Sequence, residues 1–155
     1  MNTKKLMAAL FAFPAFILIV VPESFAGSDF RAIDTARLHS LVVDNAHRME
    51  ARQATRFTVI DARPEKEYDK AHILSAISIP EADFGKSKAL LPKDRNAFLA
   101  VYCSSVKTEC RAWAEKAAAA GYANVFIYSE GFTVWKDKKM PVAPIGGRLS
   151  LQNQF

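Results

Sequence analysis

Three short runs of nearly uninterrupted apolar residues constrain the fold of this 155-residue chain more than any other feature. The runs occupy residues 57–62, 98–102 and 124–128, and β-branched or aromatic residues are frequent in them. Such runs are typical of strands that are buried on both faces of a parallel sheet. Segments of helical character separate the runs, so the sequence predicts an α/β domain in which a central parallel sheet is flanked by helices.

The segments next to these strands carry signals for helices. In the first segment, apolar residues recur at helical spacing, at Leu38, Leu41, Val42 and Met49. Asp34 and Thr35 are both candidates to cap the start of that helix. Pro64 is expected at the first position of a short second helix, which has acidic residues in its first turn.

Four further elements complete the predicted order. They are a strand at 76–79, a polar helix at 81–91, an alanine-rich helix at 109–120 and a last helix at 131–138. Pro80 ends the strand, and Gly121 closes the alanine-rich helix at its C′ position. Trp135 is expected to face inward from the last helix, and the chain from Pro141 onward is expected to form a tail.

The first 26 residues have the features of a cleaved export signal. Two lysines precede an apolar run at 6–21, and Ser24 and Ala26 place small residues where a signal peptidase requires them. The alternative is an uncleaved membrane anchor. The run is shorter than the roughly 20 residues of a spanning helix, and Pro14 interrupts it, so cleavage is favoured. We expect a mature chain that is free of the membrane, in the periplasm or outside the cell.

The predicted organisation is a signal peptide at 1–26, one globular domain at 33–143 and a C-terminal tail at 144–155. The formal net charge is +5, and it falls to +4 without the two lysines and one glutamate of the signal. The remaining cations alternate with acids, as in residues 86–95, which is typical of a solvated surface. We therefore expect no nucleic-acid partner.

The chain has two cysteines, Cys103 and Cys110. The three histidines show no ligand spacing with them, so the sequence predicts no metal site, and nothing in it indicates a cofactor. Cys103 directly follows the strand at 98–102. Ligands of parallel α/β sheets bind outside the carboxyl ends of the strands, so Cys103 lies where a functional site is expected.

The segment after Cys103 contains groups that stabilise an anion. Backbone N–H groups at the start of the next helix, together with the helix dipole, favour a thiolate, a persulfide or a bound oxyanion. Lys107 adds a positive charge, and hydroxyl donors are supplied by Ser104, Ser105 and Thr108. Such surroundings lower the pKa of a thiol and make it nucleophilic. The alternative, a small apolar residue at a strand end, is equally compatible with the loop taken alone.

Four motifs in order resemble the rhodanese-like domain family from about residue 33 to residue 142. They are Asp61 to Tyr68, Ala71 to Pro80, Val101 to Cys103, and Gly121 to Val125 followed by Glu130 to Phe132, Trp135 and Met140 to Val142. The resemblance implies a three-layer rhodanese-like fold and sulfurtransferase chemistry. In that chemistry a cysteine, by position Cys103, takes a sulfane sulfur as a persulfide and passes it to a thiophilic acceptor. The implied partners are a small donor, thiosulfate or polysulfide, and a thiol or cyanide acceptor.

The loop departs from the family pattern at two positions. Many active members carry glycine three residues after the cysteine and arginine five residues after it, where this chain has Val106 and Thr108. One extra loop residue would set Glu109 at the arginine position. An acid there opposes the binding of thiosulfate but not the carriage of a persulfide. Related phosphatases and arsenate reductases carry arginine six residues after the cysteine, and Glu109 at that position argues against both activities.

The remaining matched residues have mainly structural interpretations. Asp61 and Arg63 are expected to form a charge pair that fixes the turn after the strand, and Arg63 is also a candidate substrate-binding residue. His72 is expected in a turn or in packing, and Trp113 and Trp135 in the core.

Cys110 has two interpretations, a buried helix residue or a partner of Cys103. A disulfide needs the two Cα atoms within roughly 7 Å, and such a cysteine would resolve a persulfide or protect the thiol. The candidate site is then Cys103 as nucleophile, Cys110 as resolving residue, and a substrate-binding set of Arg63, Ser104, Ser105, Val106, Lys107, Thr108 and Glu109. Three functions stay open: a sulfurtransferase or sulfur carrier, a non-catalytic binding or sensing module, and a dithiol redox protein.

Overall fold

Five parallel strands form the central sheet of the computed structural model, which describes residues 30–55, 57–104 and 107–143. The predicted signal at 1–26, the predicted tail at 144–155 and the loop residues Ser105 and Val106 lie outside the described residues. Of Lys107 and Thr108 only the backbone is described. In the part of the chain that is described, no helix combines the length and the apolar character needed to cross a bilayer.

The order of the sheet is β1-β6-β5-β2-β4, and every neighbouring pair is parallel. The strands are β1 (Arg31–Ala32), β6 (Asn124–Tyr128), β5 (Phe98–Tyr102), β2 (Phe57–Asp61) and β4 (Ile77–Ser78). The three central strands are the three apolar runs of the sequence, and their position between two helical layers explains why they are apolar on both faces. The predicted fold class is confirmed.

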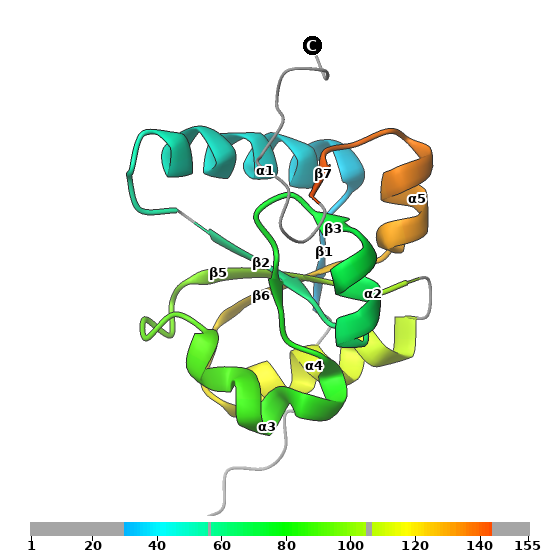
Figure 1. The fold of residues 1–155 in the computed structure, drawn as a ribbon. Helices are drawn as coiled ribbons and strands as arrows, with labels where there is room; N and C mark the ends of the chain where they lie inside the picture. The colour runs from blue at the N-terminus through cyan, green and yellow to red at the C-terminus, as the bar shows by residue number, and fades with distance from the viewer. Residues whose placement is uncertain (1–29, 56, 105–106, 144–155) are drawn as a thin grey trace, which may run out of the picture.

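Helices cover the sheet on both faces, as Figure 1 shows. One face is packed by α1 (Thr35–Glu50) and α5 (Gly131–Asp137), which share a buried cluster with the residues of β2, β5 and β6 that point to that side. The other face is packed by α4 (Lys107–Ala119) and α3 (Phe84–Ser87). The short helix α2 (Glu65–Lys70) connects β2 to the segment that follows.

Local signals account for the ends of the helices. The Asp34 side chain caps α1 by accepting a hydrogen bond from the Arg37 backbone N–H at 2.7 Å, which decides between the two predicted caps. Gly121 follows α4 with a φ of 95°, a left-handed conformation that favours glycine. Pro64 is at the N-cap of α2 rather than at its first helical position. Met49, which was expected on the apolar face of α1, is 46% exposed near the end of that helix.

The predicted helix at 81–91 is wrong as a single element. The chain there forms η1 (Glu81–Asp83), α3 and η2 (Lys88–Leu90), three short turns in succession. Phe84 and Leu91 are both buried against the face covered by α4. A chain rich in small and polar residues follows that surface in short turns more readily than it forms a regular helix.

The prediction of a tail from Pro141 is also wrong for its first residues. Val142–Ala143 form β7, which pairs antiparallel with β3 (His72–Ile73). The carbonyl of Pro141 accepts hydrogen bonds from the Trp135 indole at 2.9 Å and from the Leu74 backbone at 3.2 Å. These contacts order the segment, and a two-residue strand is too short for a periodic sequence signal.

Candidate active site around Cys103

Cys103 is the first residue after β5, at the carboxyl end of the sheet. Helix α4 begins four residues later and returns along the sheet, which brings Cys110 to a Cα separation of 5.8 Å from Cys103. The two cysteines form a disulfide, and each is 2% exposed. Of the two interpretations of Cys110, the structure therefore shows both burial and pairing.

The backbone of the site is held by the start of α5. The Phe132 N–H donates to the carbonyl of Cys103 at 2.8 Å, and the Thr133 N–H donates to the carbonyl of Ser104 at 3.5 Å. Gly131 has a φ of 77°, and a Cβ atom there would overlap the Ser104 carbonyl. Only glycine allows this close approach, so the glycine that begins α5 also sets the position of the site loop.

Beside the site loop, Asp61, Arg63 and Tyr102 form a buried polar network. The Arg63 guanidinium donates to both Asp61 oxygens, from Nε at 2.9 Å and from Nη2 at 2.6 Å. The Tyr102 hydroxyl donates to Asp61 at 2.5 Å and accepts from the Ile73 N–H at 3.0 Å. Nη2 of Arg63 also donates to the Ala71 carbonyl at 2.7 Å. The predicted charge pair is present. Through the bonds to Ala71 and Ile73, the network links β2 and β5 to the segment that contains β3.

The network fixes the charge state of its members. Burial tends to lower the pKa of Arg63, but the hydrogen bond and the negative charge of Asp61 outweigh it and raise that pKa. Burial, followed by the charge of Asp61, raises the pKa of Tyr102 well above its usual value. Arg63 therefore stays cationic and Tyr102 stays protonated, so this pair is suited to hold the turn and not to exchange protons.

His72 and the two tryptophans have the structural roles that were predicted. The His72 ring stacks on Tyr68 with 3.8 Å between ring centres, and its Nδ1 lies 3.0 Å from the Tyr68 carbonyl. Trp113 and Trp135 are fully buried, and each donates its indole N–H to a backbone carbonyl. Trp113 shares the buried cluster of the α4 face with Cys103 and Cys110, whereas Trp135 belongs to the cluster of the α1 face.

A small polar pocket of about 240 Å³ opens beside the site loop. Its lining includes Arg63, Glu67, Lys70, Ala71, Ser104, Phe132, Thr133 and Lys136. Lys70 pairs with Glu67 at 2.9 Å, whereas Lys136 has no ion-pair partner among the described residues. Arg63 is already paired with Asp61 and Lys70 with Glu67, so Lys136 supplies the unpaired positive charge of this lining, which favours a small anion.

The structure places the predicted site residues in different surroundings: in the lining of the pocket, in the core and on the surface. Arg63 and Ser104 line the pocket, and Cys103 precedes Ser104 but is buried beside it on the α4 face of the sheet. Glu109 is exposed in the first turn of α4, where an acid stabilises the helix dipole. The sequence did not point to Lys70 or Lys136, because each resembles an ordinary surface lysine until the fold brings α2 and α5 together. Among the described residues there is no group of three metal-ligating side chains.

Comparison with known proteins places this arrangement in a family. Residues 43–138 match the Rhodanese-like domain family, and the chain belongs to that family. This places it in the sulfurtransferase superfamily at the level of the domain.

Individual relatives agree with the fold. The Alr3790 protein from Anabaena sp. superposes with a TM-score of 0.57 at 22% identity, over 74% of this chain and 94% of that chain. A thiosulfate sulfurtransferase from Pseudomonas aeruginosa superposes with a TM-score of 0.58 at 19% identity, over 74% of this chain and 20% of that chain. At these identities the likeness shows the fold alone.

A further relative is a regulator. The HTH-type transcriptional regulator Rv0324 of Mycobacterium tuberculosis is 29% identical over 135 residues, which are 85% of this chain and 59% of the regulator. The chain therefore spans about three fifths of the length of that relative.

Proposed function

We propose that this protein is a sulfurtransferase or sulfur carrier that moves sulfane sulfur through a persulfide on Cys103. The observation that carries the proposal is the placement of Cys103 at the carboxyl end of β5 in a rhodanese-like domain, with its backbone carbonyl held by α5. A thiol fixed between a strand end and a helix start lies where an anionic sulfur species is stabilised.

The reaction starts from the reduced dithiol, so a two-electron thiol reductant must first open the Cys103–Cys110 disulfide. The Cys103 thiolate then attacks the outer sulfur of thiosulfate. The S–S bond of the donor breaks, sulfite leaves with the bonding pair, and Cys103 holds a persulfide. A thiol or cyanide acceptor next attacks the outer sulfur of the persulfide, and the Cys103 thiolate leaves unchanged.

Cys110 offers a second reaction by which the sulfur can leave Cys103. Its thiolate can attack the Cys103 Sγ of the persulfide, which forms the disulfide and expels hydrosulfide. The disulfide in the structure is the product that this step leaves, and it supports a resolving role for Cys110. Without fresh reductant, such a protein would release one sulfur per chain and stop.

The pocket lined by Arg63, Lys70 and Lys136 supports a small anionic partner. Thiosulfate and polysulfides are anions, and the pocket reaches Ser104, the residue after Cys103. Because Glu109 adds an acid near the start of α4, we expect a polysulfide, which carries less charge per sulfur, to be a better donor than thiosulfate.

A dithiol redox protein is the second candidate function, and the disulfide favours it. In that function Cys103 and Cys110 exchange electrons with a substrate thiol pair and no sulfur atom is transferred. Both cysteines are then required for activity. In the sulfur-transfer proposal only Cys103 is required for labelling by a donor, and this difference separates the two.

We also propose that the protein acts outside the cytoplasm, after removal of residues 1–26. The sequence pattern of that segment supports export, and the disulfide supports an oxidising compartment, where such bonds persist. Protein sequencing of the mature N-terminus from the periplasmic fraction tests both parts, with Gly27 expected as the first residue.

The decisive experiment labels the reduced protein with polysulfide and, separately, with thiosulfate, and measures the mass of the intact chain. We expect one added sulfur, about 32 Da, in Cys110→Ser and none in Cys103→Ala. In the wild type, attack by Cys110 on the persulfide should release the sulfur as hydrosulfide and return the chain to the mass of the disulfide form. Cyanide should remove the added sulfur as thiocyanate. Failure of the Cys110→Ser protein to take up sulfur from either donor would overturn the proposal. Thiol–disulfide exchange that needs both cysteines would then support the redox function.

A further inference from the structure

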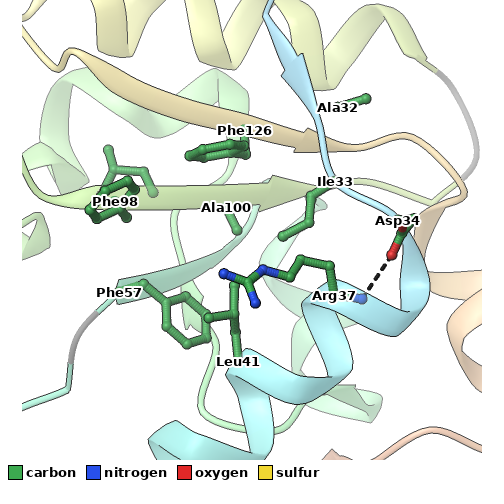
Figure 2. Close-up of a pocket in the computed structure, with 10 residues that line it drawn as sticks. Ala32, Ile33, Asp34, Arg37, Leu41, Phe57, Phe98, Ala100 and Phe126 are labelled. Carbon is green, nitrogen blue, oxygen red and sulfur yellow. Dashed lines mark hydrogen bonds between the residues drawn. The ribbon is translucent and has the colours of Figure 1, made fainter.

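A second pocket lies at the opposite end of the sheet from Cys103, between α1 and the strands (Figure 2). Its volume is about 460 Å³, and its lining is mostly apolar. The lining residues that matter here are Leu41, Phe57, Phe98, Ala100, Phe126 and Arg37. The proposed sulfur chemistry uses none of them.

The pocket exists because Ala100 is a small residue among large apolar residues on the α1 face of the sheet. Ala100 pairs with Val59 on one side and with Phe126 on the other, and its side chain points to the α1 face. On the same face Phe98 precedes it, and the rings of Phe98 and Phe126 stack with 6.1 Å between their centres. The methyl group of Ala100 leaves the space between these rings and α1 unfilled. Phe98 is 49% exposed at the mouth of this space.

Positive charge lies at the apolar pocket. The Arg37 side chain extends from α1 over the pocket towards Phe57 and Ala100, and away from Asp34, as Figure 2 shows. That side chain makes no hydrogen bond or ion pair with another described residue. Arg31 adds a second guanidinium 4.5 Å from the centre of the Phe126 ring.

One acid also lines the pocket, and it does not cancel this charge. The Asp34 carboxylate accepts the hydrogen bond of the Arg37 backbone N–H and caps α1, so it faces the positive end of the helix. The remaining charge comes from Arg37, which lines the pocket, and from Arg31, which lies over the Phe126 ring and donates a hydrogen bond to Asn124 at 2.8 Å. An apolar interior with cations at its edge matches a ligand that has an apolar body and one anionic group.

We propose that this pocket binds a medium-chain carboxylate, with its alkyl chain against Phe57, Ala100 and Phe126 and its carboxylate at Arg37. The apolar lining supplies binding energy through burial of the alkyl chain, and the free guanidinium selects an anionic head group over a neutral or cationic one. Because the pocket is at the amino-terminal end of β5 and Cys103 is past its carboxyl end, binding does not require the thiol.

The test uses isothermal titration calorimetry of the full-length mature protein with octanoate, octanol and octylammonium, which share one alkyl length. We expect octanoate to bind at one site per chain, about fivefold or more tightly than octylammonium, as expected for one exposed charge contact. Arg37→Gln should weaken this preference, because only Arg31 then remains near the pocket, and it should leave the binding of octanol unchanged. Arg37 is exposed, so this variant should fold as the wild type does.

A second variant and two controls complete the design. Ala100→Leu fills the pocket and should abolish binding of octanoate and octanol alike. Arg111→Gln, which removes a cation from the opposite helix α4, and Cys103→Ala should both bind octanoate as the wild type does. Equal affinity for octanoate and octylammonium, or no binding by the wild type, overturns the proposal. It is also overturned if the wild type is a dimer that Ala100→Leu dissociates, since a second copy then occupies the pocket.

Discussion

The two ends of the sheet are built in different ways. At the carboxyl end, polar and covalent bonds fix the chain: Asp61 holds Arg63 and Tyr102, and Cys103 is joined to Cys110. At the amino end, the α1 face is held by apolar contacts around a pocket, with Phe98 half exposed. The same three strands run through both ends, so the difference comes from the residues and not from the topology.

This contrast separates residues that stabilise the fold by apolar packing from residues that fix the position of the chain at one site. A buried ion pair adds little net stability compared with apolar packing, but it specifies one arrangement because any other leaves a charge unpaired. Under the proposed function the carboxyl end needs that specificity, because Cys103 would have to be presented in one place. The amino end has no such requirement, and it keeps space that a better packed core would fill.

The largest effect is expected from breaking the polar end. Asp61→Ala leaves the buried Arg63 guanidinium without its counter-charge, and we expect a loss of about 3–5 kcal/mol in the free energy of unfolding. Urea denaturation of the oxidised protein measures it. Glu115→Ala, which removes an exposed acid paired with Arg111 on α4, is the control and should change stability by less than about 1 kcal/mol. Equal losses in both variants would contradict the comparison.

The disulfide is expected to contribute the next largest effect. It closes a short loop, from Cys103 to Cys110, and the chain-entropy model assigns such a loop about 2.5 kcal/mol. Cys110→Ser should therefore unfold at lower urea concentration than the oxidised wild type. Addition of reductant should bring the wild type to the stability of the variant and should leave the variant unchanged. A reduced wild type as stable as the oxidised one would show that the bond adds nothing to folding.

Alkaline pH should weaken the polar end specifically. The pKa of Tyr102 is raised by burial and then by Asp61, so the folded chain holds this proton more tightly than the unfolded chain does. Its contribution to stability is complete below pH 10 and is lost as the pH rises above 10, at up to about 1.4 kcal/mol per pH unit. Tyr102→Phe should reduce that slope in denaturation curves at pH 9, 10 and 11. Some slope should remain, because burial also raises the pKa of Tyr68 and Tyr128.

The smallest effect is expected at the amino end. Phe98→Ala removes a ring that is already half exposed, and we expect a loss of less than about 1 kcal/mol. The neighbouring Leu99 is fully buried on the α4 face, and Leu99→Ala should cost about 2–5 kcal/mol in the same assay. The difference between the two losses in free energy of unfolding shows how loosely the α1 face is packed at the amino end of the sheet. Similar losses at the two positions would mean that Phe98 is part of the core.

Composition and spacing predicted the parts of the fold that repeat a simple pattern. The strands at 57–61, 98–102 and 124–128 and the helix capped by Asp34 were found because many residues contribute to one signal. The two-residue strands β1, β3 and β7 were not predicted, because they depend on contacts with distant segments. The same reason applies to residues 81–91, where buried Phe84 and Leu91 decide the path of the chain.

The site was predictable only where its residues are adjacent in the sequence or match a family motif. Cys103 and the Asp61–Arg63 pair were found in this way. The proximity of Cys110 was left open, because it depends on where α4 begins and on how the helix returns along the sheet. Lys70 and Lys136 were missed, because they come from helices that meet only in the folded chain.

The glycine at the start of α5 has a consequence for how the chain responds to opening of the disulfide. The bonds that Phe132 and Thr133 make to the carbonyls of Cys103 and Ser104 involve no sulfur, so they persist when the disulfide opens. Reduction therefore frees Cys110 from its partner while Cys103 keeps its backbone anchor. Under the proposed function, a sulfur donor would therefore meet Cys103 in the same position in every turnover, and the movement that accompanies opening of the disulfide would fall on α4.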